Sequence, residues 1–599
     1  MNRLDPHSYF DADQPRINRL RLTWNVDFDR KRLEGTAVLE LSAPSAPSAL
    51  SAWTLDLDTK GLTIRSVHTP GGKDIPFRLE DEEPILGRRL RLDLPAGTRE
   101  VAVDYETAPD AVALQWLDPA QTEGKRHPFL FSQCQPIHAR TMVPSQDSPR
   151  VRMSYHAEVT VPEALAAVMS AGPAGVRPGG KPGTRTWLFE MPQPIPSYLL
   201  ALAVGDLKSR DLSPRSRVWA EPATVGAAAS EFGEIETMIT RAEGLFGPYE
   251  WDRYDMLVLP PSFPYGGMEN PRMTFLTPTL LAGDRSLVDV VAHELAHSWT
   301  GNLVTNATMD HFWLNEGFTV WAERRILEAL HGEEAAVLGW AIGQKALEKE
   351  FERFGADSPV TKLRADLKGT DPDDVFSSIP YEKGARLVTV LERAAGRPRF
   401  DKFLRDYMGH FRFTSITSEE FRDFLEERLP GVAKEVGLDA WLHETGMPAN
   451  APVFRSKALE DLVSLASGWA KGTRPSASQI ARWKPSEMLI YLQNLPREVD
   501  RASCEWLDQT MSLTGRGNYE ILVEWLSIAV GSDYEPVFPR VREVLGRVGR
   551  MKYLRPLYTA LGRHPRTRAI AREIFDAAKE GYHSLSRRVA ETVMEKYPR

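Results

Sequence analysis

Two histidines four residues apart could bind one metal ion. Residues 293–300 read HELAHSWT, with Glu294 between His293 and His297. The preceding segment, 286–292, contains no Gly or Pro and has apolar residues at helical spacing, so we expect both histidines on one face of a helix. Such a pair is also typical of an ordinary polar helix face, and a third ligand is needed to favour a metal site.

A carboxylate further along the chain supplies that ligand. Eighteen residues separate His297 from Glu316, which opens a second helical stretch. Two imidazoles and one carboxylate leave a fourth tetrahedral position for water, which is the ligand set of a catalytic zinc rather than of a closed structural one. Glu294, next to the first ligand, could take a proton from the zinc-bound water. The sequence therefore predicts one zinc ion per chain, bound by His293, His297 and Glu316.

Length and composition predict a soluble protein of several domains. The chain has 599 residues, too many for one hydrophobic core. Its net charge is -8, and acidic and basic residues are both scattered along the chain. This pattern indicates neither a nucleic-acid partner nor a basic membrane-binding patch. Cys134 and Cys504 provide no disulfide framework and no cysteine-ligated zinc. Because no apolar segment follows Met1 and no apolar run could span a bilayer, we expect a cytoplasmic protein, given that Met1 is the natural start.

The N-terminal third of the chain carries the alternating pattern of β-strands. Clusters of Gly, Pro and Asp, such as residues 69–74, separate the alternating segments. The pattern predicts a large antiparallel β domain over residues 1–206. The alternating apolar positions are Leu20, Leu22, Trp24, Val26, Phe28, Trp53, Leu55, Leu57, Leu90, Leu92 and Leu94.

The rest of the chain changes from a mixed to a helical pattern. Residues 207–448 combine both patterns and hold most of the candidate catalytic residues. Residues 449–460 begin with the composition of a linker. Only helical segments follow over 461–599, for example 519–530, and they predict a stack of antiparallel helices. No strict period assigns them to a repeat family from the pattern alone.

A second motif, upstream of the histidines, identifies a family resemblance. Residues 264–270 read PYGGMEN, and GxMEN together with the histidine motif and the later glutamate resembles the gluzincin metallo-aminopeptidases, the family of aminopeptidase N and leukotriene A-4 hydrolase. Segments 131–135, 371–384 and 549–553 resemble the leukotriene A-4 hydrolase branch and its bacterial relatives. The resemblance implies a multidomain α+β fold with an N-terminal β saddle, a thermolysin-like α/β catalytic domain and a C-terminal α-helical domain of armadillo or HEAT type.

The resemblance also assigns the substrate-binding residues of this motif. Glu269 matches the carboxylate that anchors the free α-ammonium of a peptide at a fixed distance from the metal. The glycines before it have no Cβ, so a substrate backbone could pair with them as an added strand. By the same match, Gln135 is a neutral partner of the ammonium or of the scissile carbonyl. The motif residues assigned to substrate binding are Tyr265, Gly266, Gly267, Met268 and Glu269.

Two further residues complete the expected chemistry. Tyr381 matches the phenol that donates a hydrogen bond to the oxyanion of the tetrahedral intermediate. Glu323, two helical turns after Glu316, could accept the second N–H of a zinc-bound histidine and fix its tautomer. The alternative for Glu323 is a solvent-facing side chain paired with an arginine.

The remaining matches concern the ends of the substrate pocket. Asp373 matches an acid that favours a basic N-terminal side chain and also serves the epoxide reaction of the branch. Phe376 stands where the animal enzymes of the branch carry a tyrosine. Arg550 and Lys552 match positions that receive the free carboxylate of a short peptide. Two basic residues at this spacing on a helix do not share a face, and ordinary solvated charges are the alternative.

Together the motifs predict a zinc-dependent aminopeptidase that removes N-terminal residues from short peptides with a free N-terminus. One alternative is an epoxide hydrolase that acts on a lipid epoxide in the same pocket, which Phe376 disfavours. The other is a non-catalytic scaffold that binds a partner through its helical domain. The complete set of ligands and base disfavours that scaffold.

Overall fold

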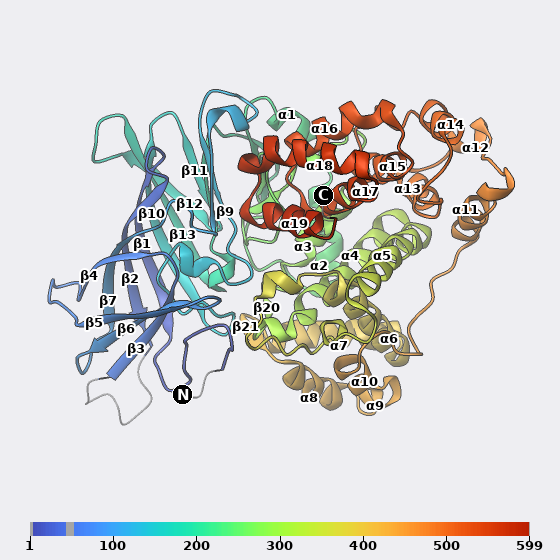
Figure 1. Cartoon of the computed structure of the whole chain (residues 1–599). Helices are drawn as coiled ribbons and strands as arrows, with labels where there is room; N and C mark the ends of the chain where they lie inside the picture. The colour runs from blue at the N-terminus through green and yellow to red at the C-terminus, as the bar shows by residue number, and fades with distance from the viewer. Residues whose placement is uncertain (1–3, 43–52, 598–599) are drawn as a thin grey trace.

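The computed structural model describes residues 4–42 and 53–597. Residues 1–3 and 43–52 of the predicted β domain and residues 598–599 of the predicted helical range lie outside the described residues. Figure 1 shows three parts in chain order: β-strands in blue to teal, a mixed part in green to yellow, and helices in orange to red. The helices of the last part lie alongside both of the others.

The N-terminal part consists of three sheets. Its strands are β1 (Ile17–Asp27), β2 (Arg32–Leu41), β3 (Trp53–Thr59), β4 (Thr63–His68), β5 (Phe77–Glu83), β6 (Gly87–Leu94), β7 (Glu100–Glu106), β8 (Leu114–Leu117), β9 (Phe129–Ser132), β10 (Arg152–Pro162), β11 (Ala166–Met169), β12 (Gly172–Pro178), β13 (Thr184–Pro196) and β14 (Leu202–Gly205). The sheets have the orders β12-β13-β10-β1-β2-β7-β4, β11-β14-β9-β8 and β3-β6-β5. Pairing is antiparallel except between β1 and β10, which are parallel.

The alternating apolar positions face the core, as their pattern predicted. Leu20, Leu22, Trp24 and Val26 on β1 are buried, and the residues between them are more exposed. Phe28 lies beyond the end of β1 and is only partly buried, because the chain turns after Asp27.

The mixed part combines a small sheet with helices. Its elements are β15 (Lys208–Ser213), β16 (Ser216–Ala220), α1 (Val225–Glu231), α2 (Ile235–Phe246), β17 (Met256–Val258), β18 (Gly267–Met268), β19 (Thr274–Leu276), α3 (Asp289–Ala296), β20 (Val304–Asn306), α4 (Trp313–His331), α5 (Glu333–Phe354), α6 (Gly384–Ala395), α7 (Arg397–His410), β21 (Thr414–Ile416), α8 (Ser418–Arg428), α9 (Val432–Val436) and α10 (Leu438–His443). The sheet order is β15-β16-β17-β19-β18, which leaves β18 at an edge.

The histidine motif lies on α3, but this helix is shorter than its sequence pattern predicted. Residues 286–288 form a turn and the helix begins at Asp289. Arg285, just before the turn, has a φ of 57°, a left-handed conformation that a helix cannot include. The second predicted helix is α4, which is buried over most of its length and ends at Gly332, where φ is 86°.

The last part is helical throughout its described residues. Its helices are α11 (Lys457–Ser467), α12 (Ala477–Ile480), α13 (Pro485–Gln493), α14 (Arg501–Met511), α15 (Tyr519–Gly531), α16 (Phe538–Arg547), α17 (Met551–Gly562), α18 (Pro565–Ala578) and α19 (Ser584–Glu595). An extended segment connects α10 to α11 (Figure 1), and α11 begins inside the range 449–460 that we assigned to a linker. The boundaries between the four predicted ranges remain predictions. Among the helices that the structure describes, none has the length and apolar character needed to cross a membrane.

A buried arginine fixes the loop that follows β9 and carries Gln135. Arg140 is fully buried. Its Nε donates to Asp147 at 2.9 Å, and its two Nη groups donate to the backbone oxygens of His7 (2.6 Å) and Leu86 (3.1 Å). Because one side chain binds two distant segments of the β-rich part and the far end of its own loop, the loop is anchored to that part.

Replacing Arg140 by Met should lower the free energy of unfolding by about 3–5 kcal/mol, because Asp147 would remain buried without its cation. Urea unfolding followed by circular dichroism measures the change. Arg177→Met is the control, since Arg177 is half exposed and its pair with Glu158 lies at the surface. That loss should stay below about 1 kcal/mol. Equal losses in both variants would contradict the anchoring role of Arg140.

Candidate active site

Three predicted metal ligands converge between α3 and α4. His293 lies on α3, His297 caps its C-terminal end, and Glu316 lies in the first turn of α4. The two Nε2 atoms are 3.1 Å apart, and Glu316 Oε2 is 3.4 Å from the first and 3.5 Å from the second. Ligand atoms around a tetrahedral zinc are about 3.3–3.6 Å apart. Glu316 Oε2 is buried without a hydrogen-bond partner, so these side chains fit a zinc ion.

Each histidine is oriented through its other ring nitrogen. His293 Nδ1 lies 3.1 Å from Glu323 Oε2, and His297 Nδ1 lies 3.0 Å from the backbone oxygen of Thr300. Nδ1 then carries the proton, and each Nε2 is left free for a metal. Glu323 is 7% exposed, so the solvent-facing alternative is wrong. Burial favours a protonated Glu323, but Arg324 and His293 outweigh it and lower the pKa of this carboxyl.

A close approach of two glycines brings Tyr381 to the ligands. A Cβ on Gly317 of α4 would lie 2.7 Å from the Cα of Gly384, which begins α6. Larger residues would force apart α4 and the π-helical turn of residues 379–383. In the observed packing the Tyr381 ring stacks on His293, with centroids 6.2 Å apart and planes at 15°. We did not single out either glycine from the sequence.

The general-base candidate lies against the edge strand. A Cβ on Gly267 of β18 would overlap the carboxylate of Glu294, so only glycine permits this contact. Glu294 is 5% exposed and its Oε2 has no hydrogen-bond partner. The open edge of β18 can also accept an extended peptide as a further strand. The glycine motif thus places a free carboxylate oxygen beside a surface suited to a peptide backbone.

Glu269 follows this strand and is 4% exposed. Gln135 Nε2 donates to its Oε1 at 3.3 Å, and Asn302 Nδ2 donates to its backbone oxygen at 2.7 Å. The first contact joins the loop after β9 to the motif, and the second joins the motif to the segment after α3. The roles of Glu269 and Gln135 toward the substrate stay predictions. Met268 packs behind it, and its sulfur accepts from Gln133 Nε2 at 3.2 Å.

The acids of the site are electrostatically unfavourable without a cation. Burial, reinforced by Glu316, raises the pKa of Glu269 to about 8. Burial also raises the pKa of Glu294 well above its ordinary value, with Glu269 adding to the effect against the opposing charge of His293. A dication among these groups favours their ionised forms. The charge distribution therefore agrees with the ligand geometry.

The residues predicted at the side-chain end of the substrate site are aromatic rings and one acid. The Phe376 ring lies 5.6 Å from Tyr265 and 6.1 Å from Tyr381. Asp373 accepts a hydrogen bond from His138 Nε2 at 2.9 Å. Sequence reasoning missed His138, because nothing in the local pattern connects it to an acid more than two hundred positions away.

The two basic candidates of the helical part have different surroundings. Arg550, immediately before α17, is 5% exposed, and its Nη2 would lie 2.6 Å from a Cβ on Gly266. Its Nη1 donates to Tyr553 Oη at 2.6 Å. The Lys552 side chain is 56% exposed, with its Nζ 2.8 Å from Glu520. Because Glu520 also pairs with Arg550, the two bases share a partner despite their spacing. Only Arg550 contacts the glycine motif.

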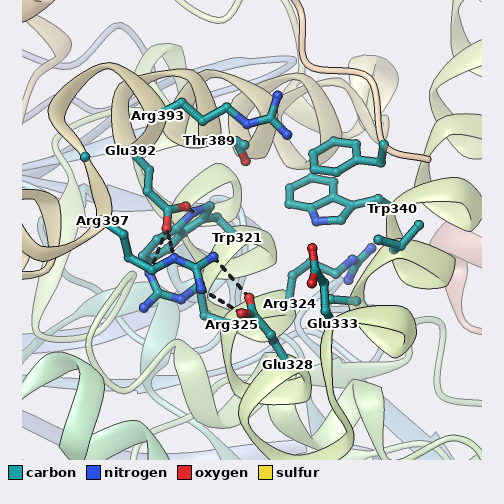
Figure 2. A pocket seen from close by; sticks show the side chains of 14 residues that line it. Trp321, Arg324, Arg325, Glu328, Glu333, Trp340, Thr389, Glu392, Arg393 and Arg397 are labelled. Carbon is teal, nitrogen blue, oxygen red and sulfur yellow. Dashed lines mark hydrogen bonds and ion pairs between the residues drawn. The ribbon is translucent and has the colours of Figure 1, made fainter. Parts of the chain in front are cut away.

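A separate cavity of about 270 Å³ lies between α4, α5 and α6, outside the set of predicted site residues (Figure 2). Its lining includes Trp321, Arg324, Arg325 and Trp340.

Comparison with known proteins agrees with this geometry. The chain matches the Peptidase M1 N-terminal domain over residues 8–199, the Peptidase family M1 domain over 232–441 and the Leukotriene A4 hydrolase C-terminal domain over 483–594. Leucine aminopeptidase 2 of Yarrowia lipolytica is 38% identical, with 97% of this chain and 92% of the relative covered. Leukotriene A-4 hydrolase of Xenopus laevis is 39% identical, with 93% of each covered.

A solved structure shows the same architecture. Yeast LTA4 hydrolase in complex with Bestatin superposes with a TM-score of 0.91 and 32% identity, covering 99% of this chain and 97% of that one. The predicted multidomain α+β fold and the class of zinc metallo-aminopeptidase are confirmed. The chain belongs to the M1 peptidase family, in the branch that carries the leukotriene A4 hydrolase C-terminal domain.

Proposed function

We propose that this protein removes N-terminal residues from short peptides that carry a free α-amino group. The observation that carries the proposal is the contact of the buried Glu269 with the partly buried Gln135 beside the three-ligand site. A buried carboxylate needs a cation, and the α-ammonium of a peptide on the open edge of β18 supplies one. The name leucine aminopeptidase 2, given to relatives that are 38% identical, supports the same activity.

The chemistry divides among a bound zinc ion and the side chains of Glu294 and Tyr381. Bound zinc supplies a Lewis acid for the scissile carbonyl and lowers the pKa of water. The free Oε2 of Glu294 takes the proton of the attacking water and later delivers it to the leaving amine. The Tyr381 hydroxyl donates a hydrogen bond to the oxygen on which negative charge develops. Burial keeps this phenol protonated by raising its pKa well above the ordinary value, and Glu316 and Glu269 add to the rise.

The proposal includes a cytoplasmic location and no nucleic-acid or membrane partner. Cys134 and Cys504 are both buried free thiols, which fits a reducing compartment. The mixed surface charges support the expectation about partners.

Epoxide hydrolysis has weaker support. The ring of Phe376 approaches Tyr265 and Tyr381 without bringing a hydroxyl to the pocket. Leukotriene A-4 hydrolase is the name of a relative, and no contact at Phe376 in this chain favours that reaction over peptide hydrolysis.

Replacing Glu294 by Gln should leave zinc bound and reduce hydrolysis of an aminoacyl chromogenic amide by about a hundredfold to ten-thousandfold. The reason is that the amide cannot accept the proton, whereas the three ligands are unchanged. Metal analysis and kcat measure the two effects. The parent enzyme should lose activity to a chelator and regain it with added zinc. Near-parent activity in a zinc-loaded variant would refute the mechanism.

Blocking the substrate N-terminus should have the same effect as removing Glu269. The parent should hydrolyse a free peptide far faster than its N-acetylated form, because only the free form pairs with this carboxylate. Glu269→Ala should lose most of that preference, at a cost of about 1.5–3 kcal/mol in kcat/KM for the free peptide. Its zinc content should match the parent. Equal cleavage of blocked and free peptides by the parent would point to an endopeptidase.

Arg550 should recognise the carboxylate of a tripeptide. The parent should prefer a tripeptide acid over its C-terminal amide, and Arg550→Ala should remove that preference at a cost of about 1.5–3 kcal/mol for the acid. The measurement is kcat/KM for both peptides. Lys552→Ala is the matched control: its side chain is half exposed and should have the smaller effect. Identical rates for acid and amide on the parent would exclude this role.

A further inference from the structure

Arg324 connects two parts of the zinc centre that are distant in sequence. One Nη of its guanidinium binds Glu323, the carboxylate that orients His293. The other Nη lies 3.3 Å from Glu382 Oε1, in the turn that carries Tyr381. One planar cation therefore contacts the supporting groups of both a metal ligand and the candidate oxyanion donor.

Two glycines of helix α5 leave space for the side chains of Arg324 and Glu382. A Cβ on Gly339 would lie 2.9 Å from Arg324 Nε, and a Cβ on Gly343 would overlap the Glu382 carboxylate. The backbone oxygen of Gly339 accepts from Arg324 Nη2 at 3.2 Å. Two glycines on one face of a helix thus make room for an acid and a base that the helix does not itself provide.

A second arginine, Arg386, and the Trp340 ring lie on the other side of Glu382 and Arg324. Arg386 Nη1 donates to Glu382 Oε2 at 2.8 Å, and Arg386 and Arg324 both lie 5.5 Å from the Trp340 ring. Glu323, Arg324, Glu382 and Arg386 are all less than 10% exposed. Two acids and two bases balance inside the protein, so removing one base leaves a buried charge uncompensated.

We propose that Arg324 is a positioning residue that fixes the orientation of His293, through Glu323, relative to Tyr381, through Glu382. The inference rests on the proposed function, because that function assigns metal binding to His293 and oxyanion stabilisation to Tyr381. The role requires the forked shape of a guanidinium, called the fork below, because its two Nη groups hold two acids in fixed directions. An ammonium is a single flexible point charge and cannot do so.

The chain offers a matched control in the next residue. Arg325 is 8% exposed, as is Arg324, and lies on the same helix. It pairs with Asp401 at 3.0 and 3.2 Å and with Glu392 at 3.1 Å. Neither acid contacts the metal ligands or the Tyr381 turn in the bonds that the structure describes. Lysine at 325 therefore tests the loss of a buried fork alone.

The experiment compares Arg324→Lys, Arg325→Lys and the parent. Zinc affinity is measured by competition with a chromophoric chelator, kcat and KM with an aminoacyl amide, and folding by thermal denaturation. Arg324→Lys should lose about ten- to hundredfold in zinc affinity and in kcat. KM should change little, because Glu269 and Gln135 are untouched. Arg325→Lys should lower the melting temperature and leave zinc affinity and kcat at parent values.

Glu382→Gln tests the contact between Arg324 and Glu382. It also provides a test if the Arg324→Lys protein does not fold. The amide keeps the shape of the side chain but loses its charge. Zinc affinity should stay at the parent value, since Arg324 still binds Glu323, and kcat should fall because the Tyr381 turn is less constrained. A parent-like kcat would overturn the link to Tyr381.

The cavity beside Arg324 permits a chemical rescue (Figure 2). Arg324→Ala enlarges this cavity, and millimolar methylguanidinium should restore part of kcat by replacing the fork. Methylammonium at the same concentration should not. Equal recovery with both cations would show that charge alone suffices and would overturn the requirement for a fork.

The outcomes separate this inference from the proposed function. A parent that binds zinc and hydrolyses the amide, with equal losses in Arg324→Lys and Arg325→Lys, would overturn the positioning role alone. A parent that neither binds zinc nor hydrolyses the amide would remove the proposed function and this role together.

Discussion

The concentration of buried carboxylates is the constraint on which the rest of the site depends. Glu269, Glu294 and Glu316 are each at most 5% exposed, and burial raises the pKa of Glu269 and of Glu294. A metal ion among the ligand atoms compensates part of this charge, and Arg324 compensates Glu323 behind His293. The fold must therefore hold acids together that repel one another, and it does so with helices, buried cations and backbone contacts.

Glycines make that concentration possible. Gly317 and Gly384 let α4 approach the Tyr381 turn, Gly267 admits Glu294, and Gly343 admits Glu382. At each position a Cβ would come within 3 Å of another residue, so a substitution would displace a functional group. Glycine is poor at stabilising a helix, and three of these glycines lie in helices. The loss of helix stability at these glycines is offset in function, because the close approach orients the metal ligands and the Tyr381 phenol.

Sequence reasoning succeeded where local geometry determines position. The spacing of His293 and His297 needs only a helix, and the alternation along β1 gave the buried face of that strand. The positions of Glu269, Tyr381 and Arg550 came from family resemblance, because no local pattern relates them to the metal. The partners His138, Arg324 and Glu382 were missed, since each acts through a contact whose other member is distant in sequence or on another element. Helix α3 begins at Asp289, later than the pattern of residues 286–292 suggested, because residues 286–288 form a turn.

The proposed substrate-binding residues come from all three parts of the fold. Gln135 comes from the β-rich part, Glu269 from the mixed part and Arg550 from the helical part. Two backbone hydrogen bonds, both 2.8 Å long, join Gly549 to Pro261 and Met551 to Pro264 on either side of Arg550 and just before the glycine motif. Side-chain contacts alone would let the guanidinium move with the helix, whereas these bonds fix the backbone that carries it. The spacing between Glu269 and Arg550 is therefore set by an interface between two parts of the fold. If they bind the two ends of a peptide, as proposed, that interface determines which peptide length is preferred.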